Sequence, residues 1–519
     1  MRITGCSSQG IGRQRPTATV AAFALSAMVA LLARVLTGPH PIDDAYITFR
    51  YARNLAEGLG LVYNPGEWVL GTTAPLWAIL LGAGYRVGLT DLPWLATTVS
   101  ALCDAASAAL LVHLGLRMGW RPVGAALVGL AWALNPMSIA FATGGMETSL
   151  FVLLALLALG LAARGSNLVV AASLCGVATL VRPEGALLAA SVVGWSWMCR
   201  RRQAVFAAAA AGAPMAIAGL TFFWRYGSPL PNSVAAKQVA YQPAWPFENA
   251  VALLVQAGLP GWSTYLLSVL PPAVGLLLAA IGLAALVDLV RRGLPWLDRR
   301  GVAWQPFAGF AALYVAFYVM VGLRGVRLFP WYLVPIEPFY LLGAAAGLAQ
   351  LTSAARLART GTWLTTGLAA LLVLWQVPAI DWRQPLLPSG EQFGREDLML
   401  DVGRGLADQL PPTAVVAAPE IGALGYASNL RVLDTVGLVS PAALPYYPLP
   451  AEQLVADNAI PARLIVDRQP DVVVTLDAFA RHSLLEDAEF MRDYRLEASY
   501  PAAVWRSQEL LMFRRVAGE

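Results

Sequence analysis

Two adjacent carboxylates, Asp43 and Asp44, directly follow the first apolar run of this 519-residue chain. A carboxylate can take the proton of an attacking hydroxyl as a general base, or it can act as a nucleophile. Neighbouring side chains project in different directions in a helix or a strand, so we expect separate roles for the two: one reacts, and the other is held by backbone or by an arginine. The alternative is that both merely cap a helix. Pro41, which fixes the preceding chain, and the position beside a long apolar run favour the catalytic interpretation.

The segment that follows the aspartates is predicted to be an amphipathic helix in a membrane interface. Its apolar residues recur at helical spacing, and its polar residues fall on the other side. We expect Asp44 to be the N-cap, and Gly58 and Gly60 to end the helix. The apolar stripe consists of Ile47, Tyr51, Leu55 and Leu59.

The composition requires a bilayer. Hydrophobic residues make up 58% of the chain and charged residues 13%, about half the charged fraction of soluble domains. The net charge of +4 comes from arginines beside apolar runs, which indicates membrane topology and not nucleic-acid binding. A span needs about 20 apolar residues. The candidate runs are 18–37, 74–89, 93–115, 122–141, 146–163, 167–181, 185–199, 203–224, 262–290, 302–323, 331–352 and 361–380.

Short loops rich in arginine usually face the cytoplasm. In this chain, all such loops lie on the cytoplasmic side only if one apolar run between residues 38 and 92 does not cross the membrane. The weakest is 74–89, which we expect to lie along the outer interface. The sequence therefore predicts a plasma-membrane protein of about eleven transmembrane helices, with its N-terminus in the cytoplasm and its C-terminus outside. The transmembrane domain is 1–380, with residues 38–92 as its first outer loop. A soluble extracytoplasmic α/β domain follows at 381–519.

This topology puts the unusual polar clusters on the extracytoplasmic side, as expected of an enzyme at the outer leaflet. A carrier would show polar groups at mid-depth and an internal repeat, and the sequence has no duplicated half. Asp104 and Glu337 are charges within spans. A transporter and a non-catalytic binding protein remain the alternatives of another class. The clusters are HPIDDAY (40–46), TGGMETS (143–149), RPEG (182–185), FWRYGSPLPNS (223–233) with Lys237, and RGVR (324–327).

Several of these motifs resemble the GT-C class of polytopic membrane glycosyltransferases, and within it the mycobacterial-type terminal arabinofuranosyltransferase B family. The resemblance implies a polyprenyl-phosphate sugar donor such as decaprenyl-phosphoryl-arabinofuranose, an arabinan-like glycan acceptor, and an essential aspartate in the first loop, here Asp43 or Asp44. Transfer of another sugar such as mannose from the same kind of carrier is an alternative. The motifs are DDAYITFRYARNLAEGLGLVYNPGEWVLGTTAPLW, GGMETSLF, LVRPEG, YGSPLPNSVAAK, RLFPWYLVP and EIGALGYASNLRVLDTVGLVSP.

A departing lipid phosphate needs positive charge, which arginine supplies through two parallel hydrogen bonds. We expect Arg324 and Arg327 to come first, because they share a face if their loop is helical. Lys237, the single lysine of the chain, and Arg225 come next. For Arg182, binding of phosphate and an ion pair with Glu184 are equally plausible.

Sugar or acceptor contacts are predicted for Glu147, Glu184, Asn232, Tyr46 and Trp77. For Glu147 the alternative is a charge at a helix N-terminus, and for the aromatic residues it is anchoring in the membrane interface. No ligand spacing requires a metal, although a divalent cation is compatible with the chemistry.

In the C-terminal domain, AVVAAPE and RVLDTV read as strands around a GALGYAS turn or short helix. PDVVVTL reads as another buried strand, and YRLEASY with ELLMFRRV as a closing hairpin. We expect this domain to bind glycan or to cover the cavity.

Overall fold

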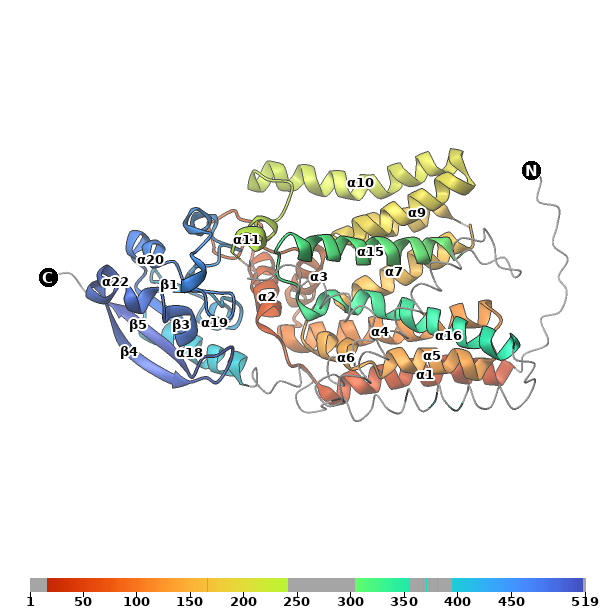
Figure 1. Ribbon diagram of the computed structural model, residues 1–519, viewed down its shortest axis with the longest axis horizontal. Helices are drawn as coiled ribbons and strands as arrows, with labels where there is room; N and C mark the ends of the chain where they lie inside the picture. The colour runs from red at the N-terminus through yellow and green to blue at the C-terminus, as the bar shows by residue number, and fades with distance from the viewer. Residues whose placement is uncertain are drawn as a thin grey trace.

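The structure, a computed structural model, describes residues 16–165, 167–240, 304–354 and 394–516, and the single residues 367, 370, 373 and 380. Within these ranges the chain forms a bundle of helices that run roughly along the long axis of the molecule, with a small α/β domain at one end (Figure 1). We call this the domain end of the bundle. Helices of the first loop lie between the bundle and the α/β domain (Figure 1).

The bundle is built from apolar helices, several of which begin with proline in the first turn, where the missing N–H needs no partner. The helices are α1 (Pro16–Thr37), α4 (Leu92–Arg117), α5 (Pro122–Ala133), α6 (Pro136–Thr143), α7 (Thr148–Ala163), α8 (Leu168–Thr179), α9 (Gly185–Cys199), α10 (Arg201–Tyr226), α15 (Gln305–Leu323) and α16 (Glu337–Ala354). The short helices α11 (Asn232–Ala240), η1 (Pro330–Tyr332) and η2 (Val334–Ile336) follow α10 and α15.

Nine of the eleven predicted spans contain a described helix, with α5 and α6 forming one span bent by 46°. In the described part of the chain, α1, α4, α10 and α15 are each long and apolar enough to cross a bilayer, and the bent pair passes the same criterion together. Helices α7, α8 and α9 are apolar but shorter. The predicted spans 262–290 and 361–380 lie wholly or largely outside the described residues. The polytopic helical fold is thus confirmed.

The charge within the second predicted span is paired. Asp104 accepts a hydrogen bond from Arg34 Nε at 2.9 Å and another from Ser138 Oγ at 3.0 Å. Both charged side chains are fully buried. An unpaired charge inside a membrane bundle is costly, whereas a hydrogen-bonded pair is tolerated. Asp104 therefore joins α1 to α4, and its contacts are those of a structural residue.

The first loop contains α2 (Asp43–Ala56) and α3 (Pro75–Arg86), and α2 runs across the end of the bundle (Figure 1). The N-cap of α2 is Ile42, in an extended conformation. The prediction that Asp44 is the N-cap was therefore wrong, and both aspartates lie in the first turn. Ile42 is the last residue with extended backbone, and no side-chain oxygen caps the helix, so the helix begins directly after it. Whether α3 lies along the interface stays a prediction.

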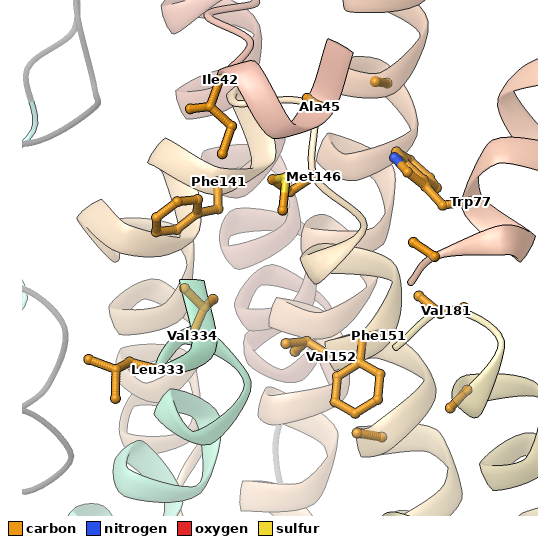
Figure 2. Close-up of a cluster of buried hydrophobic side chains, with 14 of the residues drawn as sticks. Ile42, Ala45, Trp77, Phe141, Met146, Phe151, Val152, Val181, Leu333 and Val334 are labelled. Carbon is orange, nitrogen blue, oxygen red and sulfur yellow. The ribbon is translucent and has the colours of Figure 1, made fainter. Parts of the chain in front are cut away.

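A hydrophobic cluster supports α2 from the bundle side. Figure 2 shows Ile42 and Ala45 above Phe141 and Met146, with Trp77 of α3 beside them. These side chains are buried. Burial of apolar area contributes about 25 cal/mol per Å², so this packing fixes the start of α2 against α6 and the chain before α7.

The C-terminal domain is a five-stranded mixed sheet with the order β2-β1-β3-β5-β4. Strand β1 pairs in parallel with β2 and β3, and β5 pairs antiparallel with β3 and β4. The predicted strands and the closing hairpin are confirmed. The strands are β1 (Val415–Ala418), β2 (Arg431–Asp434), β3 (Val472–Leu476), β4 (Tyr494–Pro501) and β5 (Glu509–Arg515).

Short helices surround this sheet, and α19 is the one that packs against α2. The helices are α18 (Arg395–Gln409), α19 (Gly422–Ser428), η4 (Pro441–Tyr446), η5 (Ala451–Gln453), α20 (Ala462–Arg468), α21 (Asp477–Ala480), η6 (Leu484–Glu486) and α22 (Ala488–Asp493).

Candidate functional site

The start of α2 is held by the turn between α6 and α7, which carries the GGMET motif. The amide of Ile42 donates to the carbonyl of Gly144 at 3.2 Å. Gly145 has φ +81°, and a Cβ there would lie 2.8 Å from the ring of Phe49. Only glycine fits such a position without strain. One role of this motif is therefore to let α2 approach the bundle closely.

The carboxylate of Asp43 is buried and bound by the backbone of the C-terminal domain. Its two oxygens accept hydrogen bonds from the amides of Gly422, at 3.0 Å, and Ala423, at 2.8 Å. These amides belong to the first turn of α19, where helix N–H groups lack partners within the helix. Asp43 is therefore the aspartate that the backbone holds, as the sequence predicted for one of the two.

The carboxylate of Asp44 has a different environment. It is partly exposed, and no hydrogen bond or ion pair engages it among the described residues. Desolvation raises the pKa of the Asp44 carboxyl, the positive charge of Lys237 opposes this rise, and the negative charge of Asp43 adds to it. A carboxylate with a raised pKa is a stronger base. Asp44 is thus free to accept a proton or to attack.

Lys237 of α11 is a cation without a carboxylate partner in the described part of the chain. Its Nζ lies 3.5 Å from the hydroxyl of Tyr332 and 5.4 Å from the centre of the Phe329 ring. Burial lowers the pKa of Lys237, but Tyr332 and Asp44 outweigh burial, so the pKa is raised and the ammonium form persists. This positive charge is available to an anion.

Arg182 lies in a buried ion-pair cluster. It donates to Glu147 at 3.0 Å and to Glu184 at 2.8 Å, and Tyr318 also donates to Glu184. Two carboxylates already neutralise the guanidinium, so it has little remaining attraction for a phosphate. The geometry favours the ion-pair alternative for Arg182. It also gives Glu147 and Glu184 a partner within the protein, where we had expected contacts to sugar.

Three other arginines differ from expectation. The chain from Arg324 to Arg327 is a turn followed by residues without regular secondary structure, so these two arginines do not share a helical face. Arg324 is exposed, and Arg327 donates to a backbone carbonyl of the C-terminal domain at 3.1 Å. Arg225 stacks on Trp68, with its guanidinium carbon 3.2 Å from the ring centre. Phosphate contacts by these three residues stay untested predictions.

The predicted sugar contacts of three residues meet physical obstacles. Trp77 is fully buried and donates to the carbonyl of Gly145 at 3.1 Å, so its ring is not accessible here, and its contact with a sugar stays a prediction. Tyr46 is buried against Tyr426, with ring centres 5.4 Å apart. Asn232 donates to the carbonyl of Gly437 at 2.6 Å, which ties α11 to the C-terminal domain. All three therefore contribute to packing or docking.

Sequence reasoning missed an acidic group near Asp43. Glu420 is buried and accepts from Arg395 at 2.7 Å through one oxygen, while its other oxygen has no partner among the described residues. Desolvation raises the pKa of Glu420 to about 7, against the pull of Arg395 and with a further rise from Asp43. The signal in the sequence was the motif EIGALGYAS, in which Glu420 precedes Gly422 by two positions.

Within the described ranges, no group of three or more His, Cys, Asp or Glu side chains is arranged to hold a metal ion. Among the described residues, the domain end therefore offers a carboxylate without a hydrogen-bond partner (Asp44), an ammonium group without a carboxylate partner (Lys237), and a buried ion-pair cluster.

Known structures resemble the whole chain. Two crystal structures of ArnT from Cupriavidus metallidurans, one bound to undecaprenyl phosphate and one in the apo state, superpose with TM-scores of 0.53 and 0.55. Both are 15% identical in sequence, and the match covers 97% of this chain and 99% of ArnT. The likeness confirms the predicted GT-C fold. A family model described as a domain of unknown function (DUF8728) matches residues 388–514. No curated protein sequence matches.

Proposed function

We propose that this protein is a membrane glycosyltransferase that transfers a pentofuranose from a polyprenyl-phosphate donor. The preferred sugar is arabinofuranose. The acceptor is an arabinan of cell-wall arabinogalactan or lipoarabinomannan. The supporting observation is a carboxylate, Asp44, that interacts electrostatically with the ammonium group of Lys237 at the domain end of an ArnT-like bundle, neither of them in an ion pair among the described residues. One of the ArnT structures contains undecaprenyl phosphate, which is a lipid phosphate of the proposed kind.

The proposed roles follow from charge. The sugar leaves its carrier as the acceptor hydroxyl attacks, and the polyprenyl phosphate departs as a stable anion. Lys237 stabilises that anion as the bond breaks. Asp44 accepts the proton of the acceptor hydroxyl, for which its raised pKa suits it. If donor and product share one anomeric configuration, Asp44 acts instead as a nucleophile or stabilises an oxocarbenium-like state.

The proposal also fixes an orientation. The N-terminus lies in the cytoplasm, and the first loop and the α/β domain lie outside the plasma membrane, where the donor sugar is presented. The buried ion pairs of Arg182 with Glu147 and Glu184 join the start of α7 to the turn between α8 and α9.

The test is direct transfer by the purified protein in lipid nanodiscs. Polyprenyl-phosphoryl-arabinofuranose and polyprenyl-phosphoryl-mannose are supplied separately with a short arabinan, and the product is identified by its mass and linkage. We expect extension with the arabinose donor. Extension with the mannose donor alone would replace the sugar in the proposal, and binding of donor without any product from either would reject the enzyme.

A further inference from the structure

The helix that carries the aspartates lies beside a helix of the C-terminal domain, and the two are joined at both ends. Near one end, Asp43 of α2 accepts from the amides of Gly422 and Ala423. Near the other, Arg50 of α2 donates to the carbonyls of Gly425 and Leu430, each at 2.6 Å. A carboxylate thus satisfies free amides at the start of α19, and a guanidinium satisfies carbonyls near its end.

The contact is close because glycine stands where a side chain would collide. A Cβ at Gly422 would lie 1.8 Å from the backbone oxygen of Asp43. A Cβ at Gly425 would lie 1.9 Å from the hydroxyl of Tyr63 and 2.9 Å from Arg50. The spacing of three puts both glycines on one face of α19. The sequence of α19 is therefore fitted to α2 along its length.

The edge of the sheet is attached to the same loop. Asn64 donates to the carbonyl of Val432 in β2 at 2.9 Å and accepts from the amide of the same residue at 3.0 Å. Glu67 forms an ion pair with Arg431 of β2. Because edge strands carry unpaired backbone groups, these contacts cover the β2 edge with the first loop. The domain is docked on the loop through several independent contacts.

We infer that the C-terminal domain is a positioning part of the catalytic site: α19 holds Asp43 and Arg50 of α2 and thereby sets the direction of the Asp44 carboxylate. This inference rests on the proposed function. Adjacent residues of a helix point about 100° apart, so fixing Asp43 on α19 turns Asp44 away from that contact. Asp43 and Arg50 are positioning residues, and Asp44 is the catalytic one.

This role differs from glycan binding, which the sequence suggested for the domain. A glycan-binding module acts on the affinity for acceptor, and its loss is compensated at saturating acceptor. A positioning domain acts on turnover itself, because a displacement of about 1 Å at a reacting group can reduce the rate about a hundredfold. The two roles therefore separate in the kinetics.

The experiment compares Gly422→Ala with Gly405→Ala in the full-length protein in nanodiscs. Gly405 lies on α18, and a Cβ added there would come no closer than 3.9 Å to the side chains around it, so it is the matched control. Hydrogen exchange of the amides of α2 and α19 is measured first, and kcat at saturating acceptor and the Kd for polyprenyl phosphate second. Asp43→Asn is the second variant, should Gly422→Ala fail to fold.

We expect exchange in α2 to accelerate by about tenfold or more in Gly422→Ala, since charge-assisted hydrogen bonds are lost, and to stay unchanged in Gly405→Ala. We expect kcat to fall about a hundredfold while the Kd for polyprenyl phosphate stays within about threefold. Unchanged exchange in α2, or faster exchange with an unchanged kcat, overturns the inference. An equal loss of kcat in Gly405→Ala also overturns it. If the wild-type protein transfers no sugar, the proposed function fails, and the exchange data still decide whether α19 holds α2.

Discussion

Replacing Lys237 with methionine tests which cation binds the lipid phosphate. Methionine keeps a long unbranched side chain beside Phe329 and removes the charge. The ammonium group has a tyrosine hydroxyl at 3.5 Å and no carboxylate partner within the described residues, so its charge is not already neutralised. A hydrogen bond to a charged group contributes about 1.5–3 kcal/mol. The Kd for polyprenyl phosphate should therefore rise by about 10- to 150-fold.

Arg324→Met is the matched comparison, since Arg324 is exposed at the end of α15. Solvent screens an exposed charge, and such contacts contribute about 0–1 kcal/mol, so we expect the Kd to change by less than about fivefold. The assay is equilibrium binding of a short-chain polyprenyl phosphate to each protein in nanodiscs. A larger loss of affinity in Arg324→Met than in Lys237→Met would show that Arg324 and not Lys237 is the main phosphate-binding cation, as the sequence predicted.

Four further outcomes are expected. Arg182→Met should lower the free energy of unfolding by about 3–5 kcal/mol, measured by denaturation in detergent, because two buried carboxylates lose their cation. Trp77→Ala should lower it by about 3–5 kcal/mol with an unchanged KM for acceptor, and a changed KM would return Trp77 to the sugar site. Lys237→Met should move the acid limb of the pH–rate profile to higher pH, because Lys237 lowers the pKa of Asp44, whereas Lys237→Arg should not. The raised pKa of Glu420, about 7 against 4.5, gives stability that is complete below pH 4.5 and is lost as the pH rises through 7. Glu420→Gln should therefore flatten the pH dependence of unfolding in that window, and an unchanged slope would contradict it.

The parts of the fold that depend on local pattern could be predicted from the sequence. Long apolar runs indicated the spans, and short segments rich in apolar residues indicated β1, β2, β3 and the β4–β5 hairpin. The N-cap of α2 is Ile42, two residues before the predicted Asp44, because the extended backbone ends at Ile42 and no side-chain oxygen caps the helix. Displacements of one or two residues are common at helix ends.

The site depended on contacts between distant segments, which a single sequence does not encode locally. The pairing of Arg182 with its neighbour Glu184 was one of two alternatives drawn from the sequence, and Glu147, 35 positions earlier, was not recognised as a second partner. Tryptophan is a residue type that stacks on sugars, but Trp77 is buried because α3 packs against the bundle.

The contact of Asp43 with Gly422 joins residues 379 positions apart. The expectation that one aspartate is held by backbone came from the divergence of adjacent side chains. The position of α19 was needed to identify Asp43 as that aspartate and the amides of α19 as its partners. The spacing of three between Gly422 and Gly425 is visible in the sequence, but a glycine does not indicate which residue packs against it.

Asp44 is the proposed reacting carboxylate, and comparing the wild-type protein with one variant tests this role. Wild type and Asp44→Asn are incubated in nanodiscs with polyprenyl-phosphoryl-arabinofuranose and an arabinan fragment, and transfer in one turnover is followed by mass. We expect an extended glycan with wild type, none with Asp44→Asn, and equal affinity of both proteins for polyprenyl phosphate. Transfer by Asp44→Asn at the wild-type rate would contradict this role.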